Sequence, residues 1–458
     1  MNPHIFRAYD IRGIADRDLT DDVVTNIGRA LGSAVRDAGG ERVVVGRDSR
    51  ASSPRIKTAL NAGLVSVGVT AVDIGIVPTP VTYFAANHFG DIHGLVMITG
   101  SHNPPEHNGL KLGVGKATMG GDDLLALKDR IENERYSSAS SPGKVEMKDV
   151  LEQYLSYLEE NLRVGHHKPR VVIDAGNGTG GITAMPLLER LDIPSAGLYL
   201  DPDGTFPNHE ADPTVEANLT HLRKALQEHQ AELGIAYDGD ADRIGVLDEK
   251  GRVVWGDRLL VLFARQVLQD NPGAAIVGEV KCSKTLYDDV ARHGGRPIMW
   301  KTGHTLIKAK MREEGALLGG EMSGHMFFAD RYYGFDDACY ATGRLLEILT
   351  MTGKTIGELL SDLPDTHTTP EIRVECPEEI KFEVVRRLQE RLGGQHETVT
   401  VDGVRVIHPD GWGLVRASNT QPLLVLRFEA ETKERLEVIR EEIETAVEIV
   451  RGELEQGG

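Results

Sequence analysis

The stretch GLVMITGSHNPP, residues 94–105, places a serine on a loop directly after an apolar segment. Residues 94–98 form a short, unbroken hydrophobic run, which is typical of a buried strand. Because proline cannot donate a hydrogen bond to a sheet, the strand must end before Pro104. Open α/β sheets bind their ligands at the carboxyl ends of strands. The stretch therefore predicts an α/β sheet with Ser101 at its ligand-binding edge, although taken alone it fits a surface turn equally well.

The next segment, residues 108–111, brings a cation toward this serine. Its Asn-Gly pair favours a turn, and we expect that turn to carry Lys111 back toward Ser101. A hydroxyl, the imidazole of His102 and an ammonium group held close together suit phosphate chemistry.

Length and charge limit the class of protein. The chain has 458 residues and a formal net charge of −19. Single hydrophobic cores rarely grow past about 250–300 residues, so we expect several domains. The acidic balance argues against nucleic-acid binding, which needs a basic face. An anionic substrate would need a local basic pocket to overcome the overall charge.

The sequence also predicts a cytoplasmic protein without a membrane partner. No apolar run is long enough to span a bilayer, and residues 1–7 lack the hydrophobic centre of a signal peptide. The three cysteines, Cys282, Cys339 and Cys376, are odd in number and far apart. Such cysteines fit a reducing compartment and argue against a disulfide framework or a zinc site built on them.

Strand and helix patterns alternate through most of the chain. A helix after Thr20, a strand at 43–46, a helix at 54–66 and a strand at 71–74 give the first part a βαβ rhythm. The Ser/Pro/Gly stretch at 137–143 is the clearest linker. Similar alternation continues beyond it through two further units.

From Thr368 onward the pattern changes to short strands joined by glycine-containing turns, with helices at 377–392 and 431–451. This pattern is typical of an antiparallel α+β module. We therefore predict three similar mixed α/β domains plus a C-terminal α+β domain with an antiparallel sheet, around a central cleft. The predicted domains are 1–145, 146–254, 255–367 and 368–458.

The segment DGDADR, residues 238–243, follows a predicted buried strand and places three carboxylates at alternate positions. Alternate residues of an extended segment point the same way, and an all-oxygen set favours a hard cation, Mg²⁺ or Ca²⁺. An EF-hand is the sharpest rival, because Glu249 occupies its twelfth position, but Arg243 stands where that loop needs glycine. A phosphatase with an aspartyl nucleophile is a second rival. We favour Mg²⁺, because a site with few protein oxygens leaves room for a phosphate oxygen.

Other loops carry polar groups suited to a sugar phosphate. GEMSGH at 320–325 offers a carboxylate and a hydroxyl for sugar hydroxyls, although the string alone is weak evidence. RASNT at 416–420 combines one cation with several donors, which suits a phosphate dianion or a capped turn. The glycine-rich turn at 176–181 lacks the dinucleotide and P-loop fingerprints and is interpreted as a tight strand-to-helix turn. His304 opens a helix and could act as an acid, a base or a cap.

In chain order, one in each predicted domain, these loops resemble those of the alpha-D-phosphohexomutase family, most closely its bacterial phosphomannomutase/phosphoglucomutase branch. The matching strings lie at 99–105, 238–243, 320–325 and 416–420. Further similar strings lie at 6–13, 108–111, 206–210 and 301–304. The resemblance therefore spans the whole chain.

The resemblance implies a phosphohexomutase that interconverts hexose 1-phosphate and hexose 6-phosphate, with mannose and/or glucose as the sugar. Ser101 would carry a phosphate as phosphoserine and donate it to the substrate. The resulting hexose 1,6-bisphosphate would be both intermediate and activator. Mg²⁺ would be held by Ser101, Asp238, Asp240 and Asp242.

The same resemblance assigns the remaining residues of the cleft. Lys111 and His304 would be the general acid/base pair, and Arg243 would help to neutralise charge. The sugar hydroxyls would be read by Glu321 and Ser323. The phosphate that does not react would be held by Arg416, Ser418, Asn419 and Thr420. The rest of the cleft would be lined by Arg7, Tyr9, Arg12, Lys281 and His325.

Three other functions stay open at the level of the sequence. A phosphoglucosamine mutase is the nearest, a Mg²⁺-dependent sugar phosphatase would release phosphate instead of returning it, and a sugar-phosphate sensor would bind without turnover. We expect small-molecule sugar phosphates as partners and a monomer or weak dimer. We also expect the C-terminal module to open for substrate reorientation and to close against water.

Overall fold

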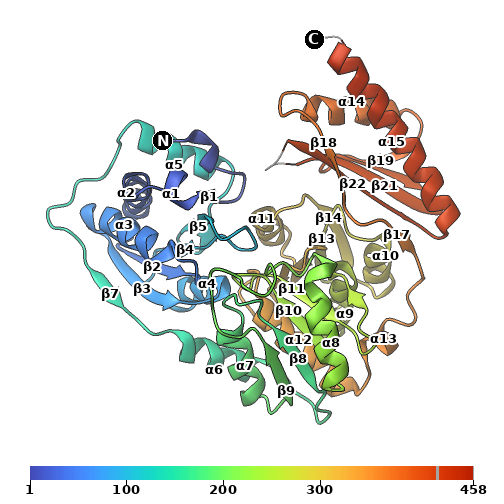
Figure 1. Ribbon diagram of the computed structural model, residues 1–458, viewed down its shortest axis with the longest axis horizontal. Helices are drawn as coiled ribbons and strands as arrows, with labels where there is room; N and C mark the ends of the chain where they lie inside the picture. The colour runs from blue at the N-terminus through green and yellow to red at the C-terminus, as the bar shows by residue number, and fades with distance from the viewer. Residues whose placement is uncertain (419–421, 457–458) are drawn as a thin grey trace.

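Four separate sheets occur among the residues that the computed structural model describes, 1–418 and 422–456 (Figure 1). The first three sheets combine parallel and antiparallel pairs, whereas the fourth is antiparallel throughout its described strands. In Figure 1 the blue N-terminal unit and the red C-terminal unit lie on opposite sides, with the green and yellow units between them. The predicted fold class is confirmed.

The first sheet carries the Ser101 loop and has the strand order β1-β5-β4-β2-β3-β7, with β6 beside β5. Its strands are β1 (Ile11–Ile14), β2 (Arg42–Arg47), β3 (Thr70–Ile76), β4 (Gly94–Ile98), β5 (His107–Val114), β6 (Ala117–Thr118) and β7 (Val145–Met147). The helices of this unit are η1 (Pro3–Ile5), α1 (Ala15–Asp18), α2 (Asp21–Asp37), α3 (Ser53–Ser66), α4 (Thr79–His88) and α5 (Asp122–Glu132). Because β7 pairs with β3, the sheet continues two residues beyond position 145.

Residues 108–111 lie inside β5 rather than in a turn, which corrects the expectation from their Asn-Gly pair. β5 runs antiparallel between β4 and β1, and its register pairs Lys111 with Met97. A Cβ atom on Gly109 would lie 2.5 Å from the carbonyl oxygen of Ile11. The glycine therefore permits a close approach between strands, and the chain reverses earlier, within the serine loop itself.

The second sheet has the order β12-β11-β10-β8-β9 and the third the order β14-β13-β15-β16. The second unit contains α6 (Leu151–Asn161), β8 (Val171–Asp174), α7 (Gly181–Arg190), β9 (Ser195–Leu198), η2 (Glu216–Leu219), α8 (Thr220–Glu228), β10 (Leu233–Tyr237), β11 (Ile244–Leu247) and β12 (Val253–Val254). The third contains α9 (Gly256–Asp270), β13 (Ala275–Glu279), α10 (Lys284–Arg292), β14 (Arg296–Trp300), α11 (His304–Glu314), β15 (Leu318–Gly320), β16 (Met326–Phe328), α12 (Ala338–Thr352) and α13 (Ile356–Leu359).

The three mixed sheets place their polar loops in equivalent positions. In each, the loop joins a buried strand to the antiparallel strand that follows it: β4 to β5, β10 to β11, and β15 to β16. The preceding strand also pairs in parallel with another strand of its sheet. The serine, aspartate and glutamate loops are thus three versions of one local structure.

The fourth unit is a meandering sheet covered on one face by two helices. Its elements are β17 (His367–Thr368), β18 (Ile372–Glu375), α14 (Lys381–Gly393), β19 (Glu397–Val399), β20 (Val404–His408), β21 (Gly411–Ala417), β22 (Leu423–Ala430) and α15 (Lys433–Gln456). A separate hydrophobic core lies between the sheet and α14 and α15. Trp412 and Leu414 form a smaller cluster with Val280 of the third unit, which joins the two units.

One continuous hydrophobic cluster links the first three units. Helix α4, which the sequence patterns do not indicate, is central to it. The ring of Phe84 in α4 packs edge-on against Tyr154 of α6 at 5.4 Å between ring centres. Because residues Thr79 to Ala86 are all buried, the helix has no polar face that would mark its period in the sequence.

No helix among the described residues has both the length and the apolar character needed to cross a membrane.

Candidate active site

The serine loop and the aspartate loop meet directly. Ser101 has a φ of 49°, in the left-handed region, and its side chain is almost fully buried. Its Oγ donates to Oδ2 of Asp238 at 2.7 Å and lies 3.1 Å from Nδ1 of His102. A Cβ atom on Gly239 would stand 2.4 Å from the carbonyl oxygen of Ser101, so the close approach of the two loops requires a glycine there.

Arg50 holds the serine loop from behind. This arginine is fully buried and its guanidinium donates to the carbonyl oxygens of Ser101 and Asn103 at 2.8 and 2.5 Å. It also reaches the carbonyl oxygens of Pro104 and His107, at 2.6 and 3.0 Å. Backbone carbonyls of an irregular buried loop need such donors. Arg50 therefore fixes the position of the loop that carries Ser101, a role that the sequence analysis missed.

Three buried carboxylates, from Asp238, Asp240 and Asp242, stand beside Ser101, with one oxygen of each within 4.8 Å of the others. Lys111 donates to Asp240 at 2.8 Å and also to Asp242. Burial, reinforced by its two acidic neighbours, raises the pKa of Asp238 well above its usual range. Against the opposing effect of burial, Lys111 holds the pKa of Asp240 below its usual range.

This aspartate cluster fits a hard divalent cation. Oδ1 of Asp240 and Oδ1 of Asp242 are buried and accept no hydrogen bond from a described residue. Buried carboxylate oxygens without partners are costly. An ion with oxygen ligands would satisfy both of them and would offset the mutual repulsion of the three carboxylates.

A second ionic network, centred on Asp336, lies beside the aspartate cluster. Its Oδ2 is 3.0 Å from Nδ1 of His325 and 3.6 Å from Nδ1 of His304, and its Oδ1 accepts from Lys308 at 3.0 Å. On the opposite edge of the ring, Nε of Arg243 donates to Nε2 of His325 at 2.9 Å. An Nε2 that accepts implies an Nδ1 that carries the proton, so Asp336 and Arg243 together fix the tautomer of His325.

The two histidine rings of this network stack at 5.6 Å between centres. Burial, and next the ammonium of Lys308, lower the pKa of His304 well below its usual range, so this ring is neutral near pH 7. The sequence analysis missed Asp336 and Lys308. The pair of aspartates before α12 resembles an ordinary helix cap, and only the three-dimensional contacts distinguish its first member.

The glutamate loop is braced by a further buried carboxylate. Glu321 accepts from the backbone N–H of Gly303 at 2.6 Å and from Ser323 Oγ at 3.2 Å. Behind it, the fully buried Glu279 accepts from the backbone N–H of Met322 at 2.9 Å. Nζ of Lys281 lies 3.6 Å from Glu279. Glu279 was also missed, because one glutamate at the end of an apolar strand carries no distinctive signal.

Arg416 reaches the cavity from β21 of the fourth unit. Its Nε donates to Oδ2 of Asp402 at 2.9 Å, and the same oxygen accepts from the backbone N–H of Thr302 at 3.1 Å. The backbone carbonyl of Ser418 accepts from Lys381 at 2.6 Å. The predicted phosphate ligands Asn419 and Thr420 lie outside the described residues.

A cavity of about 820 Å³ brings the four units together. Of the predicted site residues, those that line it are Tyr9, Arg243, Lys281, His304, Glu321, Ser323, His325, Arg416 and Ser418. Ser101 instead lines a smaller cavity of about 70 Å³ together with Phe206 and Glu210, and His102 lines both.

Two of the residues predicted to line the cleft, Arg7 and Arg12, do not line the large cavity. Arg7 is exposed and is not among the described residues that line the large cavity. Arg12 donates to Asn103 of the serine loop at 2.8 Å and to Asp10 at 2.6 Å. In this arrangement Arg12 therefore supports the loop rather than the cavity wall.

Comparisons with known proteins agree with this geometry. Four models described as phosphoglucomutase/phosphomannomutase match in order: alpha/beta/alpha domain I at 3–137, domain II at 152–251, domain III at 255–367 and the C-terminal domain at 371–446. A phosphomannomutase/phosphoglucomutase of Pseudomonas aeruginosa is 47% identical over 438 residues, which cover 95% of this chain and 94% of that protein. A phosphoglucomutase of Neisseria meningitidis is 43% identical over 451 residues, covering 97% and 96%. A solved phosphoglucomutase/phosphomannomutase family protein from Burkholderia thailandensis superposes with a TM-score of 0.92 at 43% identity, covering 98% and 97% of the two chains.

Proposed function

The chain belongs to the phosphoglucomutase/phosphomannomutase family, and we propose that it is a phosphohexomutase that interconverts the 1-phosphate and 6-phosphate of mannose and/or glucose. The observation that carries the proposal is the hydrogen bond from the buried Ser101 to Asp238, at the edge of a three-carboxylate cluster and beside a cavity lined by all four units. The names of relatives that match nearly the whole chain support this choice of sugar.

In the proposed reaction, Ser101 carries a phosphate in the resting enzyme. The bond from phosphorus to the serine Oγ breaks as a bond forms to a hydroxyl oxygen of the bound sugar phosphate, and the hydroxyl proton passes to a base of the protein. The product of this half-reaction is a hexose 1,6-bisphosphate. Its other phosphate then returns to Ser101 by the reverse steps, so no phosphate is lost.

We propose Mg²⁺ as the ion held by Asp238, Asp240 and Asp242 together with an oxygen of the Ser101 phosphate. When bound, the ion would neutralise charge on the phosphoryl group during transfer. Lys111 bridges two of these aspartates, and its ammonium would be available to the phosphate or to a sugar hydroxyl when the carboxylates are neutralised by the ion. Arg243, partly buried beside the cluster, adds a second fixed positive charge.

We propose Lys111 and His304 as the acid/base pair, and we propose His325 as a further acid or base. The fixed tautomer of His325 leaves Nε2 as the acceptor, the state that a general base requires. Glu321 and Ser323 would bind sugar hydroxyls, and Arg416 with Ser418, Asn419 and Thr420 would hold the distal phosphate. The remaining proposed binding residues are Arg7, Tyr9, Arg12 and Lys281.

The test is the covalent state of Ser101. We expect intact mass and peptide mapping of the purified protein to show one phosphate on Ser101. Incubation with mannose 1-phosphate and Mg²⁺ should remove it as hexose bisphosphate appears, because the phosphate is transferred rather than hydrolysed. The Ser101→Ala variant should carry no phosphate and lose turnover, whereas Ser49→Ala, on the neighbouring loop, should keep both.

The same experiment separates the alternatives. A serine that stays unmodified even with glucose 1,6-bisphosphate would contradict the mutase mechanism. Release of free phosphate from substrate would support a phosphatase, and binding without turnover a sensor. The comparisons do not favour a glucosamine-specific mutase or a phosphatase, since relatives at 43–47% identity over nearly the whole chain are named phosphoglucomutase or phosphomannomutase/phosphoglucomutase. We further propose a cytoplasmic monomer or weak dimer, in line with the three buried free thiols.

A further inference from the structure

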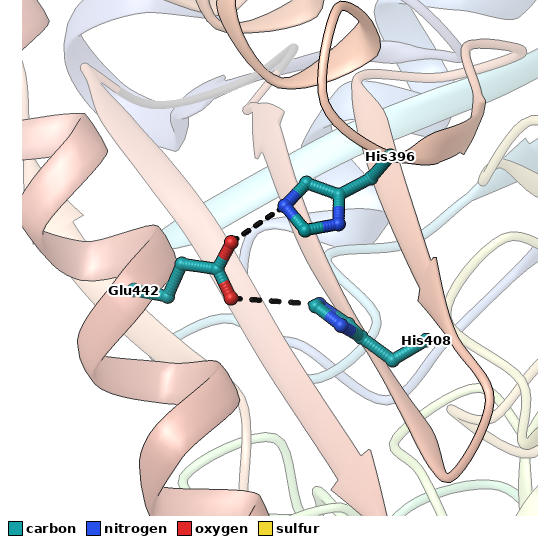
Figure 2. A group of neighbouring side chains, drawn as sticks. All are labelled: His396, His408 and Glu442. Carbon is teal, nitrogen blue, oxygen red and sulfur yellow. Dashed lines mark ion pairs between the residues drawn. The ribbon is translucent and has the colours of Figure 1, made fainter.

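A second group of metal-ligating side chains lies in the fourth unit, apart from the site already described. It consists of His396, His408 and Glu442 (Figure 2). The three residues come from different elements: His396 stands between α14 and β19, His408 ends β20, and Glu442 lies on α15. Figure 2 shows both imidazole rings turned toward the carboxylate of the helix.

Only one of the two histidines lies close enough to Glu442 to form a hydrogen bond. Nε2 of His396 lies 2.6 Å from Oε1 of Glu442, a short ion pair. Nε2 of His408 lies 3.8 Å from Oε2 of the same carboxylate, too far for a hydrogen bond. The two rings are 4.8 Å apart between centres, and all three ligand atoms lie within 4.8 Å of one another.

The unsatisfied atom is the most buried one. The side chain of His408 is only 5% exposed, and its Nε2 has no hydrogen-bond partner among the described residues. Buried polar atoms are rarely left without a partner, and such an atom points to a missing ion or water.

We propose that His396, His408 and Glu442 bind one divalent transition-metal ion, of which Zn²⁺ is the representative. Two imidazole nitrogens and one carboxylate oxygen are a donor set that such ions prefer, whereas Mg²⁺ and Ca²⁺ prefer oxygen alone. Water would complete the coordination, because Glu442 is about one-third exposed. The ion would tie α15 to the sheet and to the segment after α14.

Binding requires small movements at the cluster. Ligand atoms around a tetrahedral zinc ion lie roughly 3.3 Å apart when the bonds are about 2.0–2.1 Å long. The contact between His396 and Glu442 must therefore lengthen, and His408 must move slightly closer. The side chains of His396 and Glu442 are 22% and 34% exposed, so both have room to rotate.

The neighbouring Arg435 disfavours binding of the ion, and replacing it therefore tests the proposal. Nη2 of Arg435 lies 3.2 Å from Nδ1 of His408, and its Nε donates to Asp410 at 2.9 Å. A ligating imidazole needs its other nitrogen protonated and facing an acceptor. The guanidinium offers only donors and adds positive charge. We therefore expect Arg435→Gln, whose amide oxygen can accept from Nδ1–H, to tighten Zn²⁺ binding by roughly tenfold.

The cluster sits at the end of β20 away from the phosphate-binding loop. The register pairs His408 with Gly411, whereas Val404, at the other end, pairs with Val415 next to Arg416. Mutase activity should therefore be insensitive to this ion. For the same reason, failure of the metal proposal would leave the proposed function untouched, and the reverse also holds.

The experiment uses the full chain, freed of metal by chelation and then kept in excess Mg²⁺ to occupy the aspartate cluster. Zn²⁺ binding is measured by equilibrium dialysis with metal analysis and by the rise in Tm. We expect His396→Ala and Glu442→Gln to lose one equivalent of Zn²⁺, with affinity at that site falling more than about 100-fold, beyond the loss of an outer partner. Zn²⁺ should raise the Tm of the wild type but not of these variants.

The controls separate this site from the active site and from misfolding. His367→Ala replaces an exposed histidine of the same unit and should bind Zn²⁺ like the wild type. Asp240→Asn should alter only binding at the aspartate cluster. The two partly exposed ligands carry the test, because replacing the buried His408 could unfold the unit. Equal stoichiometry and affinity in wild type, His396→Ala and Glu442→Gln would overturn the proposal, as would weaker binding in Arg435→Gln.

Discussion

Asp336 illustrates how a residue without a motif can govern a site. It touches two histidines and a lysine from within a fully buried position. Its Oδ2 lies 3.0 Å from Nδ1 of His325, and Arg243 donates to Nε2 on the opposite edge of the ring. The aspartate therefore acts through His325 rather than on the substrate.

Replacing this carboxylate should impair turnover more than binding. We expect Asp336→Asn to lower kcat for mannose or glucose 1-phosphate about 100-fold, at the lower end of general acid–base contributions, with KM changed less than about threefold. The reason is that the uncharged amide, which can donate as well as accept, favours the Nδ1–H tautomer of His325 less than the carboxylate does. Steady-state kinetics check this.

Asp337→Asn is the matched control, since its carboxylate is equally buried but bonds to Tyr154 and Tyr332 rather than to the histidines. An unchanged kcat in Asp336→Asn, or equal losses in both variants, would contradict a positioning role.

Residues of the site could be predicted from the sequence when they stand in a short polar string, and not when they stand alone as Asp336 does. Ser101 and the three aspartates stand in short strings whose chemistry is visible locally. Arg50 and Glu279 act through backbone atoms of distant segments, so their importance exists only after folding. No local pattern distinguishes them from ordinary buried charges.

At the scale of elements, α12 begins at a carboxylate that is unusually hard to ionise. Asp337 accepts from the backbone N–H of Tyr340 at 2.8 Å and caps the helix. Burial raises its pKa to about 6, although the capping N–H and two tyrosine hydroxyls oppose the rise. The folded state therefore binds this proton more tightly than the unfolded chain does.

This cap predicts a pH-dependent stability. An acid whose pKa is raised by folding contributes stability at low pH and loses it as the pH rises from about 4 toward 6 and beyond. Asn caps a helix as well as Asp but carries no charge. We expect the Tm of Asp337→Asn, relative to the wild type, to increase by roughly 2–4 °C between pH 5 and pH 7. A difference in Tm that is constant with pH, measured by calorimetry, would contradict the raised pKa.

The sequence predicted well those helices and strands that have a clear hydrophobic period or that end at proline or glycine. The strand β4 has the bounds that its apolar run predicts, Gly94–Ile98, and ends at the serine loop as expected. Helix α4 and strand β5 were misjudged for a common physical reason. Both are buried on nearly all sides, so neither the polar face of a helix nor the alternation of a half-exposed strand is present.

At the scale of the whole molecule, one residue of the third unit, Thr302, contacts the first and fourth units through its backbone. The carbonyl oxygen of Thr302 accepts from Tyr9 at 2.8 Å, and its N–H donates to Asp402 at 3.1 Å. Asp402 also holds Arg416, the proposed phosphate ligand. Thr302 therefore links the first and fourth units at the cavity, next to the apolar contact of Val280 with Trp412 and Leu414.

Weakening this contact should open the fourth unit and loosen substrate binding. We expect Asp402→Asn to raise KM about tenfold with little change in kcat, because a charge-assisted hydrogen bond is worth about 1.5–3 kcal/mol. Small-angle scattering should show a larger radius of gyration without substrate and compaction when it is added.

Asp410→Asn, which removes an ion pair within the fourth unit, is the control and should behave as the wild type. The absence of compaction in the wild type on adding substrate would contradict the expected opening and closing.

The contact between Ser101 and Asp238 also sets an order of events during synthesis. The two residues are 137 positions apart, and Arg416 follows much later in the chain. A nascent chain emerging from the ribosome folds its N-terminal domains first, so the serine loop exists for a time without its acidic partner. The proposed nucleophile therefore gains its acidic partner only when the second unit emerges, and the proposed ligands of the distal phosphate are made only when translation is nearly finished. Under the proposed mechanism, an incomplete chain lacks both the metal ligands and the ligands of the distal phosphate, and we expect it to be inactive.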